Sequence, residues 1–285
     1  MAAGATDHPS AMSWDEYADI VEAEWQQVLN DPKCTEAKVH SFLEDHPCLI
    51  PGYDAFNASA RREGLPPGPI YEAVFSKPRL TPGRDSYVPD FMWLPTDSLT
   101  QWAVLIEIEN PLKPWFRKDG QQTQYFTQAI GQLADWVHTL EGDPENVQAF
   151  KKRYGIRRRL SFNYCLIFGR RSDAMSSVRG TMRHIGFRDS AFKLMTYDRL
   201  RPAEPARNAL CIKASRNRYT AISAPPTLRL ETNLPQMWHP VTGKEEAVAR
   251  SPHFTDERRA YLIERLRYWD GRIRGGSSGS VQGRE

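Results

Sequence analysis

Residues 89–109 decide the fold of this chain and indicate its chemistry. They begin with Pro89-Asp90-Phe91, continue through a short linker, and end in the apolar run Trp102-Ala-Val-Leu-Ile-Glu107-Ile-Glu109. Both segments are predicted to be β-strands. Because side chains alternate along a strand, Glu107 and Glu109 share one face. Each of the two strands therefore brings acidic side chains to one of its ends.

Carboxylates held this close together predict a bound cation. Burying like charges is unfavourable unless a positive charge lies between them. Mg²⁺ fits because it takes oxygen ligands from carboxylates and keeps positions open for phosphate oxygens and water. Mn²⁺ accepts the same oxygen ligands. The pattern P-D, spacer, E-x-(K or E) therefore predicts a metal site of the kind found in nucleases.

Each acid also has a structural interpretation. Asp90 could end a strand and accept hydrogen bonds in a turn, and Glu107 could form a salt bridge with an arginine. Glu109 could be solvated, because Asn110-Pro111 ends the strand. The three acids together are more specific than any one of them.

The composition indicates a globular protein. The chain has 285 residues, of which 40% are hydrophobic, and no apolar run approaches the ~20 residues of a membrane span. No secretory signal is visible at the start, so we expect a cytoplasmic protein that does not enter a membrane. Four cysteines lie far apart in the sequence and predict reduced thiols.

The charges are divided unevenly along the chain. Residues 1–150 hold 10 Lys and Arg against 23 Asp and Glu, a net −13, whereas residues 151–285 hold 28 against 12, a net +16. This split suggests an acidic metal-bearing part and a basic part that faces nucleic acid. In the alternative interpretation, the two parts attract each other or a partner chain.

The periodicity predicts an α/β fold with a central mixed sheet flanked by helices. We expect a flexible leader at 1–12, an N-terminal helix within 13–34, an α/β domain at 35–205, a basic region ending in a helix at 206–272, and a disordered tail at 273–285. Within these parts, strands are predicted at about 70–76, 87–94, 102–109, 160–168 and 192–197, and helices at 13–30, 35–46, 119–140, 143–153, 173–185 and from Thr255 to about 271. A hairpin is expected at 208–224, and an irregular, proline-rich segment at 225–252.

The helix at 119–140 adds a polar element. Gln124, Gln128 and Gln132 recur every four residues, and Gln132-Leu-Ala-Asp-Trp136 has the form Q-x-x-x-aromatic. A glutamine at the edge of a metal site can hydrogen-bond a phosphate or position a ligand, while the aromatic one turn later packs the helix on the sheet. The alternative is a helix with an ordinary polar side.

Several segments, in this order, resemble the nuclease domain of the Shedu anti-phage defence proteins, a branch of the PD-(D/E)xK superfamily with a restriction-endonuclease-like fold. The resemblance covers about residues 35–200. The segments that carry it are Phe42-Leu-Glu-Asp-His-Pro47, Pro89-Asp90-Phe91, Ile106-Glu-Ile-Glu-Asn-Pro111, Pro114-Trp-Phe116, Lys118-Asp-Gly120, Ala129-Ile-Gly-Gln-Leu-Ala-Asp-Trp136, Leu166-Ile-Phe-Gly-Arg170 and Thr196-Tyr-Asp-Arg-Leu200.

The resemblance implies roles for particular residues. Asp90 and Glu107 would be metal ligands, together with the backbone carbonyl of Ile108. Gln132 corresponds to the glutamine of the helical motif. Glu44 corresponds to an upstream helical glutamate that serves as an outer or second-metal ligand, although it could also be a simple surface acid.

One position departs from the family pattern. Glu109 stands where the family usually has the lysine of E-x-K. A lysine there would orient water and offset charge in the transition state. An ionised glutamate cannot donate a proton, but it can bind a second cation or act as a base. Lys113, four residues further on, is a candidate to reach back.

Arginine clusters supply a surface that could face phosphates. They are Arg157, Arg158 and Arg159 before one strand, Arg170 and Arg171 after it, and Arg179 and Arg183 on the next predicted helix. Each cluster could instead be a solvated face. No phosphate-cradling G-x-x-x-x-G-K-(S/T) is present, so we expect no NTP hydrolysis.

The function expected from these features is Mg²⁺-dependent cleavage of DNA phosphodiesters in anti-phage defence, with Asp90, Glu107, Glu109 and Gln132 as catalytic residues. One alternative is a nucleic-acid- or protein-binding module that kept the fold and lost the chemistry. Another is a scaffold that self-assembles through its acidic and basic parts. The resemblance also implies a homo-oligomer.

Overall fold

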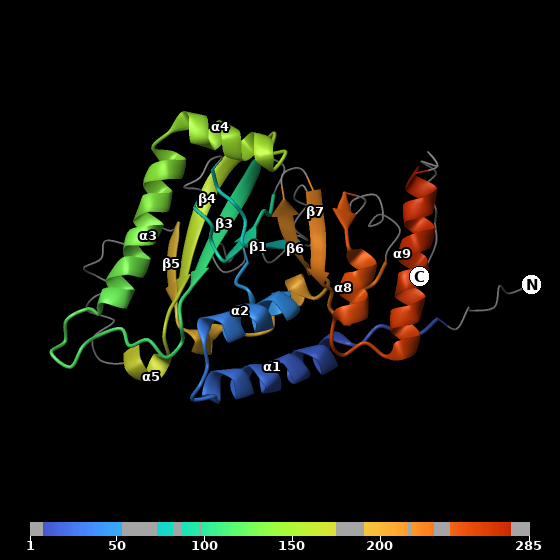
Figure 1. The fold of residues 1–285 in the computed structure, drawn as a ribbon, viewed down its shortest axis with the longest axis horizontal. Helices are drawn as coiled ribbons and strands as arrows, with labels where there is room; N and C mark the ends of the chain where they lie inside the picture. The colour runs from blue at the N-terminus through green and yellow to red at the C-terminus, as the bar shows by residue number, and fades with distance from the viewer. Residues whose placement is uncertain are drawn as a thin grey trace, which may run out of the picture.

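The computed structural model describes residues 8–52, 73–81, 87–96, 99–174, 191–215, 218–230 and 240–274. The helices in these ranges are α1 (Trp14–Asn30), α2 (Glu36–Asp45), α3 (Gln124–Glu141), α4 (Pro144–Arg153), α5 (Arg171–Ala174), α8 (Lys244–Arg250) and α9 (Asp256–Arg274). The strands are β1 (Ala73–Ser76), β2 (Phe91–Trp93), β3 (Thr100–Ile108), β4 (Arg159–Ile167), β5 (Phe192–Met195), β6 (Leu210–Ser215), β7 (Arg218–Ser223) and β8 (Val241–Thr242). Figure 1 shows how these elements are arranged.

The strands form one mixed sheet in the order β5-β4-β3-β2-β1-β6-β7-β8. Strand β3 pairs in parallel with β4 and antiparallel with β2, and β1 pairs antiparallel with β2 and in parallel with β6. The predicted α/β class with a mixed sheet flanked by helices is thus confirmed. The sheet continues past residue 205, because β6, β7 and β8 extend it.

Helices cover both faces of the sheet, which explains why its central strand is almost wholly apolar. In β3, Val104, Ile106 and Ile108 join the core that includes residues of α1 and α2. Ala103 and Leu105 join the core on the opposite face, with residues of α3, α4, α8 and α9. Because side chains alternate, Glu107 follows Leu105 toward the face that carries α3.

Capping side chains set the starts of the helices, as their sequences predict. Ser13 accepts a hydrogen bond from the Glu16 N–H at the start of α1, and Thr35 does the same for Lys38 in α2. Thr255 accepts from the Arg258 N–H and opens α9, which confirms its predicted role. In α3, the buried side chains recur at helical spacing and keep Gln132 at the edge of the buried side.

The prediction that residues 225–252 are irregular is wrong for the second half of this segment. Residues 241–242 form β8, and Lys244–Arg250 form α8. The sequence KEEAVAR has few apolar residues, so its pattern is weak, but Ala247 and Val248 are buried against the core. The predicted helix at 173–185 lies mostly outside the described residues, which show α5 ending at Ala174.

The two ends of the described chain meet. In Figure 1 the N-terminal trace passes beside α9, and the Arg258 guanidinium donates to the Pro9 carbonyl at 2.8 Å and to the Leu228 carbonyl at 2.7 Å. Arg258 is only 2% exposed. Its buried charge is therefore matched by backbone carbonyls contributed by two separate segments.

The cysteines and the helix compositions bear on two further expectations. All four cysteines are buried free thiols, as their spacing predicted. Among the residues that the structure describes, the helices lack the combination of length and apolar composition that a membrane crossing requires.

Candidate metal centre at the end of strand β3

Pairing of β2 with β3 brings two predicted ligands together. Phe91 lies opposite Ile106 in antiparallel register, so Asp90 falls opposite Glu107. The Ile108 N–H donates to Asp90 Oδ2 at 2.9 Å, which fixes this carboxylate at the end of β3. Asp90 is 4% exposed and Glu107 9%. The pairing of β2 with β3 therefore buries two neighbouring acids at one end of these strands.

Only one of the two carboxylate oxygens of Glu107 accepts a hydrogen bond from a described residue. Gln132 Nε2 on α3 donates to Glu107 Oε1 at 2.7 Å, while the buried Oε2 has no hydrogen-bond partner among the residues that the structure describes. Burial raises the pKa of Glu107 well above its usual range, and the negative charges of Asp90 and Glu109 raise it further. An ionised Glu107 in this place requires additional positive charge.

Lys77 brings a positive charge that the sequence did not assign to the site. It follows β1, opposite Asp90, where its N–H donates to the Asp90 carbonyl at 2.8 Å. Its ammonium lies 2.6 Å from Asp90 Oδ1. Partial burial alone would lower the pKa of Lys77, but the hydrogen bond to Asp90 and the charges of Asp90, Glu107 and Glu36 raise it. Lys77 is therefore a cation at neutral pH.

Glu109 is bound by a different lysine. Lys113 reaches back and forms an ion pair with Glu109 Oε2, as the sequence suggested it could. The Tyr197 hydroxyl donates to the Glu109 carbonyl. In the part of the chain that the structure describes, the ligand atoms of Asp90, Glu107 and Glu109 do not gather within 4.8 Å of one another, so the expected meeting of the three acids around one ion is not seen; the group of three that meets this distance lies elsewhere. The centre is therefore built around the pair Asp90 and Glu107, with Glu109 beside it.

Helix α2 turns one polar stripe toward this centre. Glu36, His40 and Glu44 follow each other at intervals of four and therefore share a face of the helix. Burial raises the pKa of Glu36, and the negative charges of Glu109 and Asp90 raise it further. The stripe therefore adds more negative charge to a site already rich in carboxylates.

His40 lies near both Glu44 and Asp90. Its ring lies 3.7 Å from an oxygen of each, through Nδ1 to Glu44 Oε1 and through Nε2 to Asp90 Oδ1. The ring stacks on Phe91 with 4.7 Å between centroids. Burial lowers the pKa of His40 despite its acidic neighbours. Glu44 also accepts a hydrogen bond from Ser76 Oγ at 2.5 Å and lies 3.6 Å from Lys213 Nζ. His40 therefore lies between Glu44 and Asp90 without a hydrogen-bond distance to either carboxylate.

Comparison with known protein families finds a match that covers the centre. The family model described as "Shedu protein SduA, C-terminal" matches residues 33–200, more than half of the chain. The chain belongs to the Shedu family. The matched part contains α2, strands β1 to β5 and helix α3, and so every residue of the centre described above. No curated protein matches the chain significantly.

The first arginine cluster of this Shedu protein lies far from the carboxylates. Arg159 pairs with Thr100 at the start of β3, seven residues before Glu107. At 3.3 Å per residue, this is a separation of roughly 23 Å. Arg157, Arg158 and Arg159 are exposed, and Arg158 donates to Thr96 Oγ1 at 2.6 Å. This cluster is therefore not part of the centre.

The second arginine cluster lies at the same end of the sheet as the carboxylates. The Arg170 guanidinium contacts Asp198 Oδ1 at 2.9 Å and donates to the Leu29 carbonyl at 2.6 Å. The Arg171 N–H donates to Asp198 Oδ2 at 2.6 Å, while its side chain is exposed. Arg170 thus ties α1 to the segment after β5. Arg179 and Arg183 lie outside the described residues.

Sequence reasoning missed Lys77, Glu36 and His40. For the two residues on α2, the interval of four from Glu44 was a usable signal, because it places all three on one helix face. For Lys77 no local signal exists. Its position depends on the pairing of β1 with β2, and these strands are separated by residues without a regular pattern.

Proposed function

We propose that this protein is a Mg²⁺-dependent endonuclease that cleaves DNA phosphodiesters in anti-phage defence, on a sheet of the PD-(D/E)xK type. Family membership supports the defence role. The observation that carries the chemistry is the buried Glu107, which lies beside Asp90 and has one oxygen without a hydrogen-bond partner in the described part of the chain. A site with excess buried negative charge is suited to a divalent cation.

The residues present fit magnesium. Asp90, Glu107 and the Ile108 carbonyl offer the hard oxygen ligands that Mg²⁺ or Mn²⁺ prefers, and Glu44 is available as an outer ligand. When bound, the metal supplies a Lewis acid that polarises the phosphate and lowers the pKa of the attacking water. Gln132 holds Glu107 in place through Oε1 and leaves Oε2 free.

Lys77 takes over the task of the missing E-x-K lysine. It is a protonated donor beside Asp90, and its side chain is 49% exposed, so its ammonium can turn toward a bound phosphate. There it offsets the negative charge that develops during cleavage. Glu109 then acts as a base on water at the edge of the site, with its charge moderated by Lys113.

The partners that we propose are DNA and further copies of the same chain. The exposed Arg157, Arg158 and Arg159 and the exposed Arg171 provide positive charge that contacts the DNA backbone without reading its sequence. Arg170 is held by Asp198 and Leu29, so it supports the fold and not the DNA contact.

Plasmid nicking tests the proposal. Glu107→Gln keeps the size of the side chain and its hydrogen bond with Gln132 but removes the charge that would hold the metal. We expect the wild type to nick plasmid DNA with Mg²⁺ and to stop on addition of EDTA, and Glu107→Gln to be inactive while remaining folded. The matched control is Asp135→Asn, which removes an exposed charge from α3. Nicking by Glu107→Gln at the wild-type rate would reject the assignment.

The second candidate is a binding module that kept the fold but not the chemistry. It is favoured by Glu109 at the E-x-K position and by the lysines that already neutralise Asp90 and Glu109. Under this candidate the wild type binds DNA and does not nick it. Creation of nicking by Glu109→Lys in such an inactive parent would identify the natural chain as a degenerate nuclease.

A further inference from the structure

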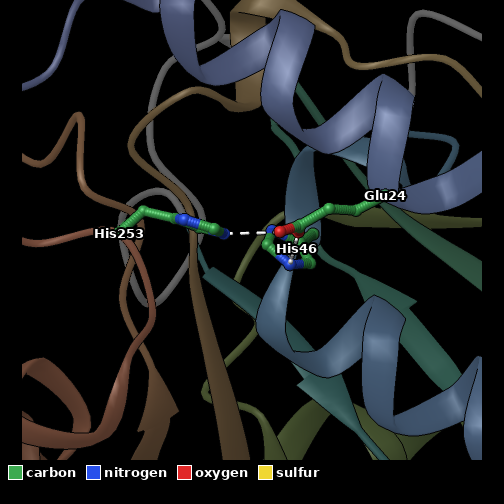
Figure 2. A group of neighbouring side chains, drawn as sticks. All are labelled: Glu24, His46 and His253. Atoms are coloured by element: carbon green, nitrogen blue, oxygen red, sulfur yellow. Dashed lines mark hydrogen bonds and ion pairs between the residues drawn. The ribbon is translucent and has the colours of Figure 1, made fainter.

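A second polar cluster lies away from the carboxylate centre. Glu24 projects from α1, His46 follows the last residue of α2, and His253 lies in the turn between α8 and α9. Figure 2 shows the three side chains converging from these separate segments. One potential ligand atom from each residue lies within 4.8 Å of the other two. Glu24 and His253 also fall outside the residues that the family model matches.

The distances between the ligand atoms are close to those around a zinc ion. Glu24 Oε2 lies 3.3 Å from His253 Nε2 and 3.6 Å from His46 Nε2. Ligand atoms of a tetrahedral zinc ion lie roughly 3.3 Å apart, given bonds of about 2.0–2.1 Å. Two of the three edges therefore already have nearly the right length, and the third, between the two histidines, is at most 4.8 Å.

The surroundings of His46 hold its ring in a ligating orientation. The Tyr17 hydroxyl lies 3.1 Å from Nδ1 and leaves Nε2 directed at Glu24. Phe42 packs on the ring with 4.4 Å between centroids. A fixed hydrogen bond at the far ring nitrogen is the usual support of a metal-binding histidine. The 3.6 Å from Nε2 to Glu24 is too long for a hydrogen bond, so direct contact with Glu24 does not satisfy this nitrogen.

The three side chains of the cluster are buried to different degrees. Burial, and to a smaller extent the neighbouring His253, lower the pKa of His46 to about 4. His46 is 3% exposed, whereas the His253 and Glu24 side chains are 21% and 36% exposed. The cluster can thus be reached from solvent on one side.

We propose that Glu24, His46 and His253 form a zinc site that fastens the turn before α9 to helices α1 and α2. Two imidazoles and one carboxylate make a donor set that suits zinc better than magnesium or calcium, and water would complete a tetrahedron. The residues come from both ends of the chain, so the ion joins segments that are 229 residues apart at the widest. Its role is structural and independent of the carboxylate centre.

Calorimetric titration of the metal-free, full-length protein with Zn²⁺ tests this proposal. We expect one zinc ion per chain, and at least a tenfold weaker affinity in His253→Ala, which removes a partly exposed ligand from a turn. His138→Ala is the matched control, because His138 is exposed in the last turn of α3, and it should bind like the wild type. Glu107→Gln should also bind like the wild type, which separates this site from the carboxylate centre.

Thermal unfolding and cobalt spectra provide independent readouts. Zinc at about 100 times its Kd should raise the Tm of the wild type by roughly 5 °C and leave that of His253→Ala unchanged. Co²⁺ should give the strong visible absorption of a tetrahedral site in the wild type alone. If His253→Ala does not fold, Glu24→Gln serves in its place. Absence of zinc binding by the wild type, or equal binding by the ligand variant and the His138→Ala control, would overturn the proposal.

Discussion

The carboxylate centre at the end of β3 and the Glu24–His46–His253 cluster are assembled in different ways. The first is built on adjacent strands, where Asp90 and Glu107 face each other across a ladder. The second is built by packing three segments from distant parts of the chain. The first gathers several carboxylates and has one buried oxygen without a hydrogen-bond partner among the described residues, whereas the second combines a single carboxylate with two imidazoles. Under the two proposals made above, these sites in one fold would favour different metals, a hard cation at the first and zinc at the second.

Replacing Lys77 should have the largest effect, because the carboxylate centre would lose the ammonium group that lies beside Asp90. We expect Lys77→Met to lower the rate of Mg²⁺-dependent nicking about 100-fold, the usual loss for one donor to transition-state charge. Lys77→Arg should recover part of that rate. Zinc binding should not change in either variant.

These rates are measured on supercoiled plasmid at saturating Mg²⁺. Equal rates for Lys77→Met and Lys77→Arg would show that the charge of residue 77 does not matter for cleavage. The ion pair with Asp90 would then serve only the fold.

A smaller effect concerns the stability of the metal-free protein. Burial raises the pKa of Glu107 in the folded state, so folding becomes less favourable as the pH rises above the unfolded pKa of about 4.3. We expect Glu107→Gln to be more stable than the wild type by about 1–3 kcal/mol at neutral pH, with a difference near zero at pH 4. Urea unfolding at a series of pH values measures this.

The same urea unfolding experiment can be repeated in the presence of Mg²⁺. Because the cation would compensate the buried charge, Mg²⁺ should stabilise the wild type and leave Glu107→Gln unaffected. A stability difference that does not change between pH 4 and pH 8 would contradict the role given to the buried carboxylate.

Features that depend on local pattern were predictable from the sequence. The apolar run of β3 predicted a buried strand, and the spacing of apolar residues in α3 predicted the helix that presents Gln132. The capping residues Ser13, Thr35 and Thr255 marked helix starts within a residue. In each case the residues that form the sequence pattern lie within the helix or strand itself or directly before it. The pattern is therefore enough to predict the element.

Features that depend on long-range packing were not predictable. Lys77 reaches Asp90 only because β1 pairs with β2, and no spacing in the sequence indicates that register. The same holds for His253, whose partners lie more than 200 residues earlier. Helix α8 was missed because its sequence is mostly charged, and burial of Ala247 and Val248 decides its conformation.

Mn²⁺ binding measured by electron paramagnetic resonance, with Mg²⁺ as competitor, tests whether Asp90 and Glu107 together hold a divalent cation. We expect the wild type and His253→Ala to bind a Mn²⁺ ion that Mg²⁺ displaces, and we expect Asp90→Asn and Glu107→Gln not to bind it. Binding by Glu107→Gln as tight as that of the wild type would contradict the claim that Asp90 and Glu107 together hold the cation.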